Sequence, residues 1–246
     1  MNKLPHVNLA FWIKKISATT LGETAGDLLS MTLAVGYGAS SVVLLCFFAL
    51  TLLGQLAVRR YHPPLYWSVI LATSTAGTTL SDFMDRSLGL GYAKGSALLV
   101  TLLLGVLVLW HRTERSLAVD RAMSRRAEIF YWSAILFSNT LGTALGDFLA
   151  DSSGLGFAGG ALLIGSLLAL VVALTLFTRL SRVALFWVAF VLTRPFGATL
   201  GDVLTKAPSV GGLGLGTLGS LAVLFSVLAL LVTRESWARR ASDAAA

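Results

Sequence analysis

The chain has 246 residues, of which 56% are hydrophobic and only 13% are charged, and its formal net charge is +7. A soluble domain typically carries about 25% charged residues and fewer apolar ones. This composition therefore excludes an ordinary water-soluble domain and predicts an integral membrane protein. The single cysteine, Cys46, excludes a disulfide framework, and no Cys/His cluster has the spacing of a zinc site.

Apolar stretches close to the membrane-spanning length of about 20 residues recur along the chain. Each is predicted to be a transmembrane helix. The eight predicted spans are 11–35, 39–58, 65–84, 93–111, 129–150, 157–178, 183–204 and 213–233. Lys14 and Lys15 interrupt the first apolar run and no small-residue cleavage pattern is evident, so this run is predicted to be a helix and not a signal peptide.

The basic residues lie mainly on one side of this eight-span topology. Fifteen of the 19 Lys and Arg residues do so, whereas Arg86, Lys94 and Lys206 fall on the other side and Arg194 lies within a span. The positive-inside rule then places both termini in the cytoplasm. The basic charge is thus explained by topology, and no nucleic-acid partner is expected. Four charged residues are expected at the outer surface, solvated or paired with loop groups: Asp85, Asp151, Arg86 and Lys206.

One pattern occurs four times: a Trp is followed fifteen residues later by an Asp. The pairs are Trp12 with Asp27, Trp67 with Asp82, Trp132 with Asp147, and Trp187 with Asp202. A glycine stands ten residues after each Trp, at Gly22, Gly77, Gly142 and Gly197. The pattern predicts one membrane domain over 1–246, made of repeats at about 5–60, 61–115, 126–180 and 181–235, with a charged cytoplasmic connector at 112–128.

Each predicted repeat contains two spans, so all four repeats insert in the same orientation and are related by an axis along the membrane normal. The predicted fold is therefore an all-α integral membrane protein, with eight transmembrane helices arranged as four helical hairpins in a pseudo-symmetric bundle. The recurrent Trp residues are expected to anchor the bundle in the aromatic belt at the cytoplasmic boundary.

Four short motifs carry a family resemblance. They are Leu21-Gly22-Glu23-Thr24-x-Gly26-Asp27, Gly77-Thr78-Thr79-x-Ser81-Asp82-Phe83, Ser138-Asn139-Thr140-Leu141-Gly142-Thr143-x-x-Gly146-Asp147-Phe148 and Thr193-Arg194-Pro195-x-Gly197-Ala198-Thr199-x-Gly201-Asp202. From about residue 5 to 235 the chain resembles a bacterial membrane-protein family built from four tandem two-span repeats of unknown function. The resemblance implies the architecture and a bacterial inner membrane location, but no activity.

The first span of each repeat carries a polar stripe, because residues four apart share one face of a helix. The stripes are Thr19-Glu23-Asp27, Ser74-Thr78-Asp82, Asn139-Thr143-Asp147 and Arg194-Ala198-Asp202. The second spans consist almost entirely of Leu, Val, Ala and Gly. The first spans are therefore predicted to face one another around the polar stripes.

Five carboxylates on these stripes face one cation, Arg194; they are Glu23, Asp27, Asp82, Asp147 and Asp202. Each charge costs about 2.5–3.5 kcal/mol at a helix centre, and such groups usually line an interior path or pair with one another. Protonation or a bound cation would relieve their repulsion, which predicts an outward-facing acidic vestibule and a proton-coupled cation carrier.

The ligand types refine this hypothesis. Carboxylate, hydroxyl and amide oxygens, including those of Thr78, Thr143 and Asn139, favour a hard divalent metal such as Mn²⁺ or Mg²⁺. Arg194 is expected to pair with Glu23 or with a neighbouring Asp, or to gate the site. The expected partners are the lipid bilayer, the cation and protons, with no cofactor; the sequence does not indicate the oligomeric state.

Three other functions are consistent with the pattern. An Asp ring around a pseudo-symmetric axis is typical of a cation channel, although Glu23, Thr78, Thr143 and Ala198 at the equivalent deeper position favour an asymmetric carrier site. Each Asp could instead accept backbone N–H groups of the adjacent glycine-rich connector, as in a structural or partner-binding protein. Paired carboxylates also act in aspartic proteases, but four copies exceed the two required, so no enzyme is predicted.

Overall fold

A computed structural model describes residues 3–119 and 123–244, so that part of the connector at 112–128, including Arg121, lies outside the described residues. All regular structure in the described chain is helical. The α-helices are α1 (Leu9–Asp27), α2 (Tyr37–Ala57), α3 (Pro63–Asp82), α4 (Tyr92–Glu114), α5 (Arg125–Asp147), α6 (Gly156–Phe177), α7 (Arg182–Thr205) and α8 (Gly216–Ala244). A π-helical turn follows α1, α3 and α5, at η1 (Leu28–Thr32), η2 (Phe83–Ser87) and η3 (Phe148–Ser152), and the 3-10 turn η4 (Pro208–Val210) follows α7.

The helix boundaries follow from local chemistry. The Asn8 side chain accepts a hydrogen bond from the Phe11 amide at 2.9 Å and caps α1, and Ser124 caps α5 in the same way. In the outer connectors, Gly36 and Gly91 have φ values of 84° and 71°. Only glycine adopts such values readily, so the glycine-rich connectors allow the chain to turn into α2 and α4.

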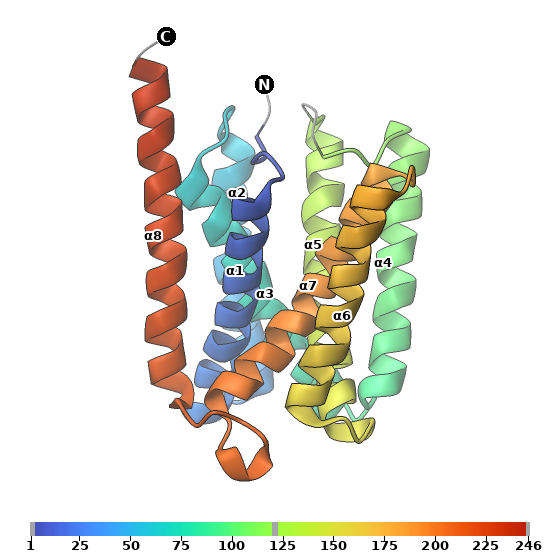
Figure 1. Cartoon of the computed structure of the whole chain (residues 1–246), viewed down its shortest axis with the longest axis vertical. Coiled ribbons are helices and arrows are strands. Elements are labelled where there is room, and N and C mark those ends of the chain that lie inside the picture. Colours follow the sequence, from blue (N-terminus) through green and yellow to red (C-terminus); the bar gives the residue numbers. More distant parts are fainter. Residues whose placement is uncertain (1–2, 120–122, 245–246) are drawn as a thin grey trace.

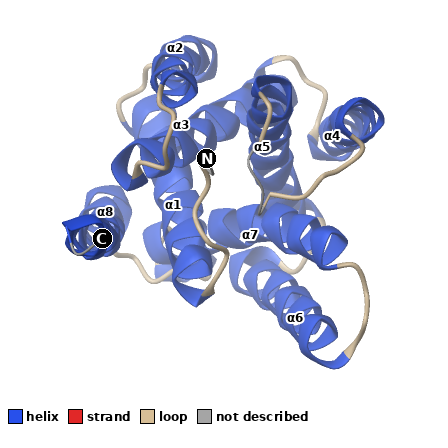
Figure 2. Ribbon diagram, turned by 90° about the horizontal axis from the view of Figure 1, so that it is seen from above, coloured by secondary structure: helices blue, strands red, loops and turns tan. Residues whose placement is uncertain are grey.

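The four first helices, α1, α3, α5 and α7, form a closed inner ring in which each contacts two others of the ring, as the polar stripes predict. The second helices, α2, α4, α6 and α8, lie outside this ring (Figure 2). The polar stripes therefore face the centre of the bundle, and the most apolar helices cover it.

The sequence predicts that the two helices of each repeat pair as a hairpin, but the second helices do not pack along the first helices of their own repeats. Instead, α2 packs along α3, α4 along α5, α6 along α7, and α8 closes the circle by packing along α1. Within the described residues the two helices of one repeat make few contacts or none. The prediction of packed hairpins is therefore wrong: each repeat gives its outer helix to the first helix of the next repeat.

Glycines allow the inner helices to approach closely. A Cβ added to Gly77 would lie 2.9 Å from the Thr140 amide nitrogen, and one added to Gly26 would lie 2.8 Å from the Thr78 Cβ. Gly142 of α5, which is equivalent to Gly77, packs directly on Arg194. The recurrent glycine thus lets each inner helix contact the polar stripe of the following one.

Among the described residues, five helices are long and apolar enough to cross a membrane, namely α2, α4, α6, α7 and α8. They indicate a multi-pass membrane protein. Helices α1, α3 and α5 have comparable lengths, but their polar stripes lower their hydropathy. The N- and C-terminal ends lie at the same end of the bundle (Figure 1).

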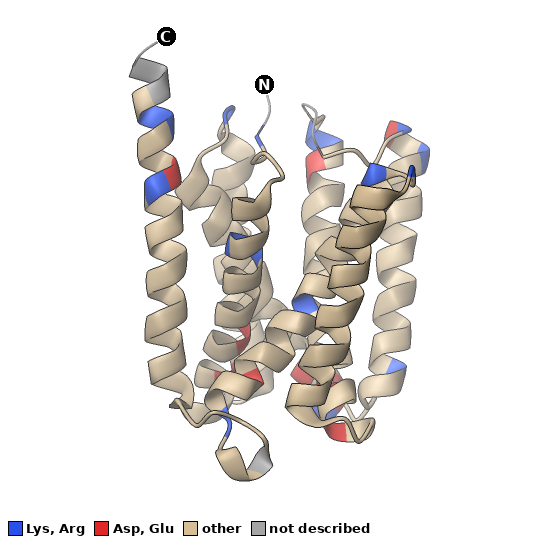
Figure 3. Ribbon diagram, viewed as in Figure 1, with Lys and Arg blue, Asp and Glu red and all other residues tan. Residues whose placement is uncertain are grey.

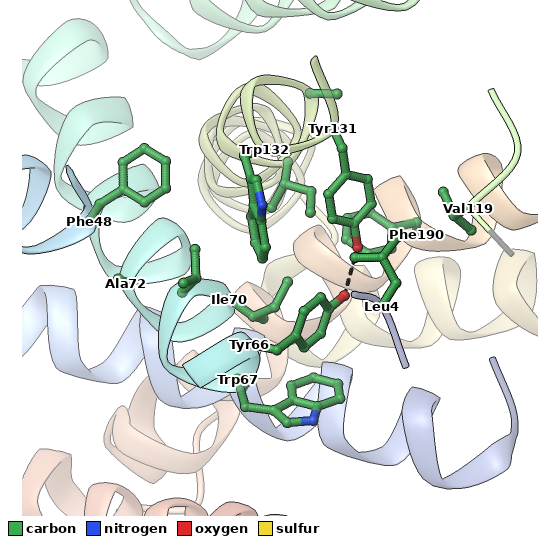
Figure 4. Close-up of a cluster of buried hydrophobic side chains, with 14 of the residues drawn as sticks. Leu4, Phe48, Tyr66, Trp67, Ile70, Ala72, Val119, Tyr131, Trp132 and Phe190 are labelled. Atoms are coloured by element: carbon green, nitrogen blue, oxygen red, sulfur yellow. Dashed lines mark hydrogen bonds between the residues drawn. The ribbon is translucent and has the colours of Figure 1, made fainter. Parts of the chain in front are cut away.

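The recurrent Trp residues are in the core. Trp67, Trp132 and Trp187 are at most 5% exposed, so the prediction that they anchor the protein in the lipid interface is wrong for these three. They surround a contact between Tyr66 and Tyr131, whose hydroxyls lie 2.6 Å apart (Figure 4). These residues form an aromatic layer that closes the bundle near the termini.

Candidate functional site

A cavity of about 100 Å³ lies between the inner helices and collects carboxylates from all four repeats. Its lining consists of Glu23, Asp27, Met31, Asp82, Arg86, Asp147, Asp151, Phe157, Asp202 and Lys206. Most of the acidic residues drawn in Figure 3 lie at the end of the bundle opposite the termini, with a few near the termini, whereas most Lys and Arg residues lie near the termini. The structure thus brings the five predicted carboxylates to one shared chamber.

The deepest carboxylate, Glu23, forms a buried ion pair with Arg194. The Arg194 Nη1 lies 2.8 Å from the Glu23 Oε2, and the two side chains are 0% and 5% exposed. The hydroxyls of Thr78 and Thr143 also donate to this oxygen, at 3.0 and 3.1 Å. The predicted ion pair is therefore present, and Thr78 and Thr143 donate hydrogen bonds to Glu23 at the floor of the cavity.

All of these bonds involve one carboxylate oxygen. Glu23 is 3% exposed as a residue and lines the cavity, yet its Oε1 has no hydrogen-bond or ion-pair partner among the described residues. Arg194 also donates from Nη2 to the Ser74 carbonyl at 3.2 Å, whereas its buried Nε has no partner among the described residues. One oxygen of Glu23 is thus held by the protein while the other remains available to the cavity.

Arg86 and Lys206 do not lie free at the outer surface, contrary to expectation. Arg86 contacts Asp82 at 2.9 Å and Asp147 at 3.2 Å, and Lys206 contacts Asp202 at 3.3 Å. Burial lowers the pKa of Lys206, but Asp202 and the other acidic groups raise it more, so its pKa lies above the ordinary value. The side chain therefore stays charged at neutral pH.

Two further expectations about the charges are also wrong. Lys15, assigned to the cytoplasmic side, is 0% exposed inside the inner ring, where its Nζ lies 3.4 Å from the Asn139 Oδ1 and 4.1 Å from the Phe190 ring centre. Asn139 therefore contacts Lys15 and not the cavity. Asp85, expected at the surface, is 5% exposed and accepts a hydrogen bond from Ser81.

The cavity does not present a ready metal site. Within the described residues, no three Asp, Glu, His or Cys side chains are placed to hold one metal ion. The expectation of a divalent-metal site therefore finds no support in this conformation. The four recurrent aspartates, called the ring carboxylates below, are Asp27, Asp82, Asp147 and Asp202. A role in capping the connectors would require them to accept hydrogen bonds from main-chain amides, and in the described chain they accept none.

The family match follows the same four repeats as the sequence and the helices. The chain matches the family described as Repeat of Unknown Function (DUF347) over residues 10–61, 65–116, 130–181 and 185–241. It belongs to this family. No curated protein and no solved structure matches the chain.

The DUF347 repeats differ at a position that the sequence analysis did not use, four residues after the ring Asp. It is occupied by Met31, Arg86, Asp151 and Lys206, all of which line the cavity. The signal was present in the sequence, since Asp82–Arg86 and Asp202–Lys206 have the spacing of ion pairs on one helix face. Each repeat thus contributes one common carboxylate and one variable side chain.

Proposed function

We propose that this protein is a proton-coupled cation carrier of the bacterial inner membrane. The observation that carries the proposal is the single cavity that collects carboxylates from all four repeats. Ionisable groups inside a membrane protein are costly and usually mark a substrate or proton path. Six carboxylates line this cavity, the five predicted ones and Asp151, whereas among the described residues three cations contact them, Arg86, Arg194 and Lys206, so the cavity retains negative charge that a cation or protons can balance.

The proposal includes eight membrane crossings with both termini in the cytoplasm. Helices α1, α3 and α5 cross as inner helices whose polar faces are shielded by the apolar outer ones. The accumulation of Lys and Arg at the end that holds the termini supports this orientation through the positive-inside rule (Figure 3). The acidic cavity then faces the outside of the cell.

The two ends of the bundle differ, which favours a carrier over a channel. The buried Glu23–Arg194 pair forms the floor of the cavity, and the aromatic layer around Tyr66 and Tyr131 closes the opposite end. A carrier exposes its site to one side at a time, whereas a channel requires a continuous path. Protons take part because neighbouring carboxylates exchange a bound cation for protons as the cation leaves.

Flux in liposomes tests this function. Purified protein should take up a cation when a pH gradient is imposed and should acidify or alkalise the lumen in proportion. Glu23→Gln should abolish coupled flux, while Glu114→Gln, at the opposite end of the bundle, should leave it intact. Gradient-independent conductance would instead establish a channel, and the absence of any cation flux would contradict both transport functions.

A further inference from the structure

The four repeats can be compared at the residue four positions after the ring Asp. In repeat two this residue is Arg86, which lies in the π-helical turn η2 and contacts its own Asp82 at 2.9 Å and Asp147 of repeat three at 3.2 Å. In repeat four it is Lys206, which contacts its own Asp202 at 3.3 Å. Three of the four ring carboxylates therefore already hold a cation that is covalently part of the protein.

Repeats one and three have no cation at this position: repeat three carries Asp151, but its Asp147 is held by Arg86 of repeat two, whereas no cation contacts Asp27 of repeat one among the described residues. In repeat one the residue at this position is Met31, in the equivalent π-helical turn η1, and an apolar thioether cannot neutralise Asp27. Asp27 has no ion pair or hydrogen bond among the described residues, although it lines the cavity. One helical turn deeper on the same face, the Glu23 Oε1 also lacks a partner among the described residues, and the Glu23 side chain is 5% exposed.

We propose that Asp27 and the Glu23 Oε1 bind the transported cation, and that this cation is a monovalent organic ammonium ion. It would take the place beside Asp27 that the Arg86 guanidinium takes beside Asp82. This inference rests on the proposed carrier function and names its substrate class. Arg86 and Lys206 act as built-in cations that occupy the other three ring carboxylates and confine the cargo to repeat one.

The pairing pattern and the lining both support this class. Asp27 is the one ring carboxylate that no cation contacts among the described residues, so a single positive charge can pair with it, whereas a divalent ion needs several converging ligands that the described residues do not offer. Met31 and Phe157 add apolar surface to the same cavity. An alkyl group of an ammonium ion can contact such surface, while a strongly hydrated metal ion gains nothing from it.

The internal comparison supplies the test variant. Met31→Arg recreates in repeat one the Asp–Arg pair of repeat two, so its guanidinium should occupy Asp27 and compete with the cargo. Met31 is 41% exposed, and the longer side chain has room to fit without disturbing the core. Affinity for methylammonium, measured by calorimetry on the detergent-solubilised full chain, should fall roughly tenfold or more. Met31→Leu and Leu33→Arg are the matched controls for side-chain change and added charge, and both should retain wild-type affinity.

A second variant works in the opposite direction. Lys206→Met removes the built-in cation from Asp202 and should raise the number of methylammonium ions bound per chain from one toward two. If the wild type transports cations but Met31→Arg binds methylammonium as well as the wild type does, the inference is overturned and the carrier function stands. The same holds if wild-type protein binds Mn²⁺ or Mg²⁺ in preference to methylammonium. If wild-type protein binds and transports no cation of either class, the carrier function itself fails.

Discussion

Replacing Arg194 with Met is the sharpest structural perturbation, because it removes one partner of the buried ion pair and keeps most of the side-chain length. Glu23 would then retain only hydroxyl donors, from Thr78 and Thr143, for a carboxylate that is 5% exposed. Breaking a buried pair on one side leaves an uncompensated charge and costs about 3–5 kcal/mol. We therefore expect Arg194→Met to lower the free energy of unfolding by that amount.

Unfolding by SDS in mixed micelles, followed by tryptophan fluorescence, measures this loss. Arg179→Met is the control: Arg179 is exposed and makes no ion pair in the described part of the chain, so its variant should change stability by less than about 0.5 kcal/mol. The double variant Glu23→Gln/Arg194→Met should recover much of the loss, because both charges are gone. Equal stability of Arg194→Met and Arg179→Met would refute the buried pair.

Two further stability predictions follow from packing. Gly142→Ala places a methyl group against Arg194 and should cost about 1–3 kcal/mol in the same assay; Gly105→Ala, whose added Cβ meets nothing within 4 Å, should be neutral or slightly stabilising, and equal effects of the two would contradict the close helix approach. Tyr66→Phe should cost about 1–3 kcal/mol because it leaves the buried Tyr131 hydroxyl unpaired. The double variant Tyr66→Phe/Tyr131→Phe should be closer to wild type, and additive losses would show that the hydroxyl contact is not formed.

Periodicity was sufficient to predict the inner ring of the fold. The four-residue spacing of the stripe positions, repeated in four copies, predicts the polar stripes at the centre, and it limits the partner of Arg194 to Glu23 or a neighbouring Asp. The outer helices were different. Their sequences are apolar on every side, so they carry no signal of which inner helix they contact, and the packing of all four outer helices on neighbouring repeats could not be predicted.

The charges missed by sequence analysis have two separate causes. Lys15 lies close to the predicted end of a span, and linear position does not show that its side chain points into the inner ring toward Asn139 of α5 and Phe190 of α7. Arg86 and Lys206 were placed at the surface because they follow the spans, although their spacing from Asp82 and Asp202 permits an ion pair. Long basic side chains reach back along a helix to a buried carboxylate.

Proton release on cation binding tests the central claim most directly. Methylammonium added to weakly buffered, detergent-solubilised protein should release protons until one site per chain is filled, as a pH indicator would record. Asp27→Asn should abolish the release, because it removes the unpaired carboxylate, and Glu23→Gln should shift the release to higher methylammonium concentration. Saturable release that both variants leave unchanged, or the absence of release from wild-type protein, would contradict a shared acidic cavity in which a cation and protons compete.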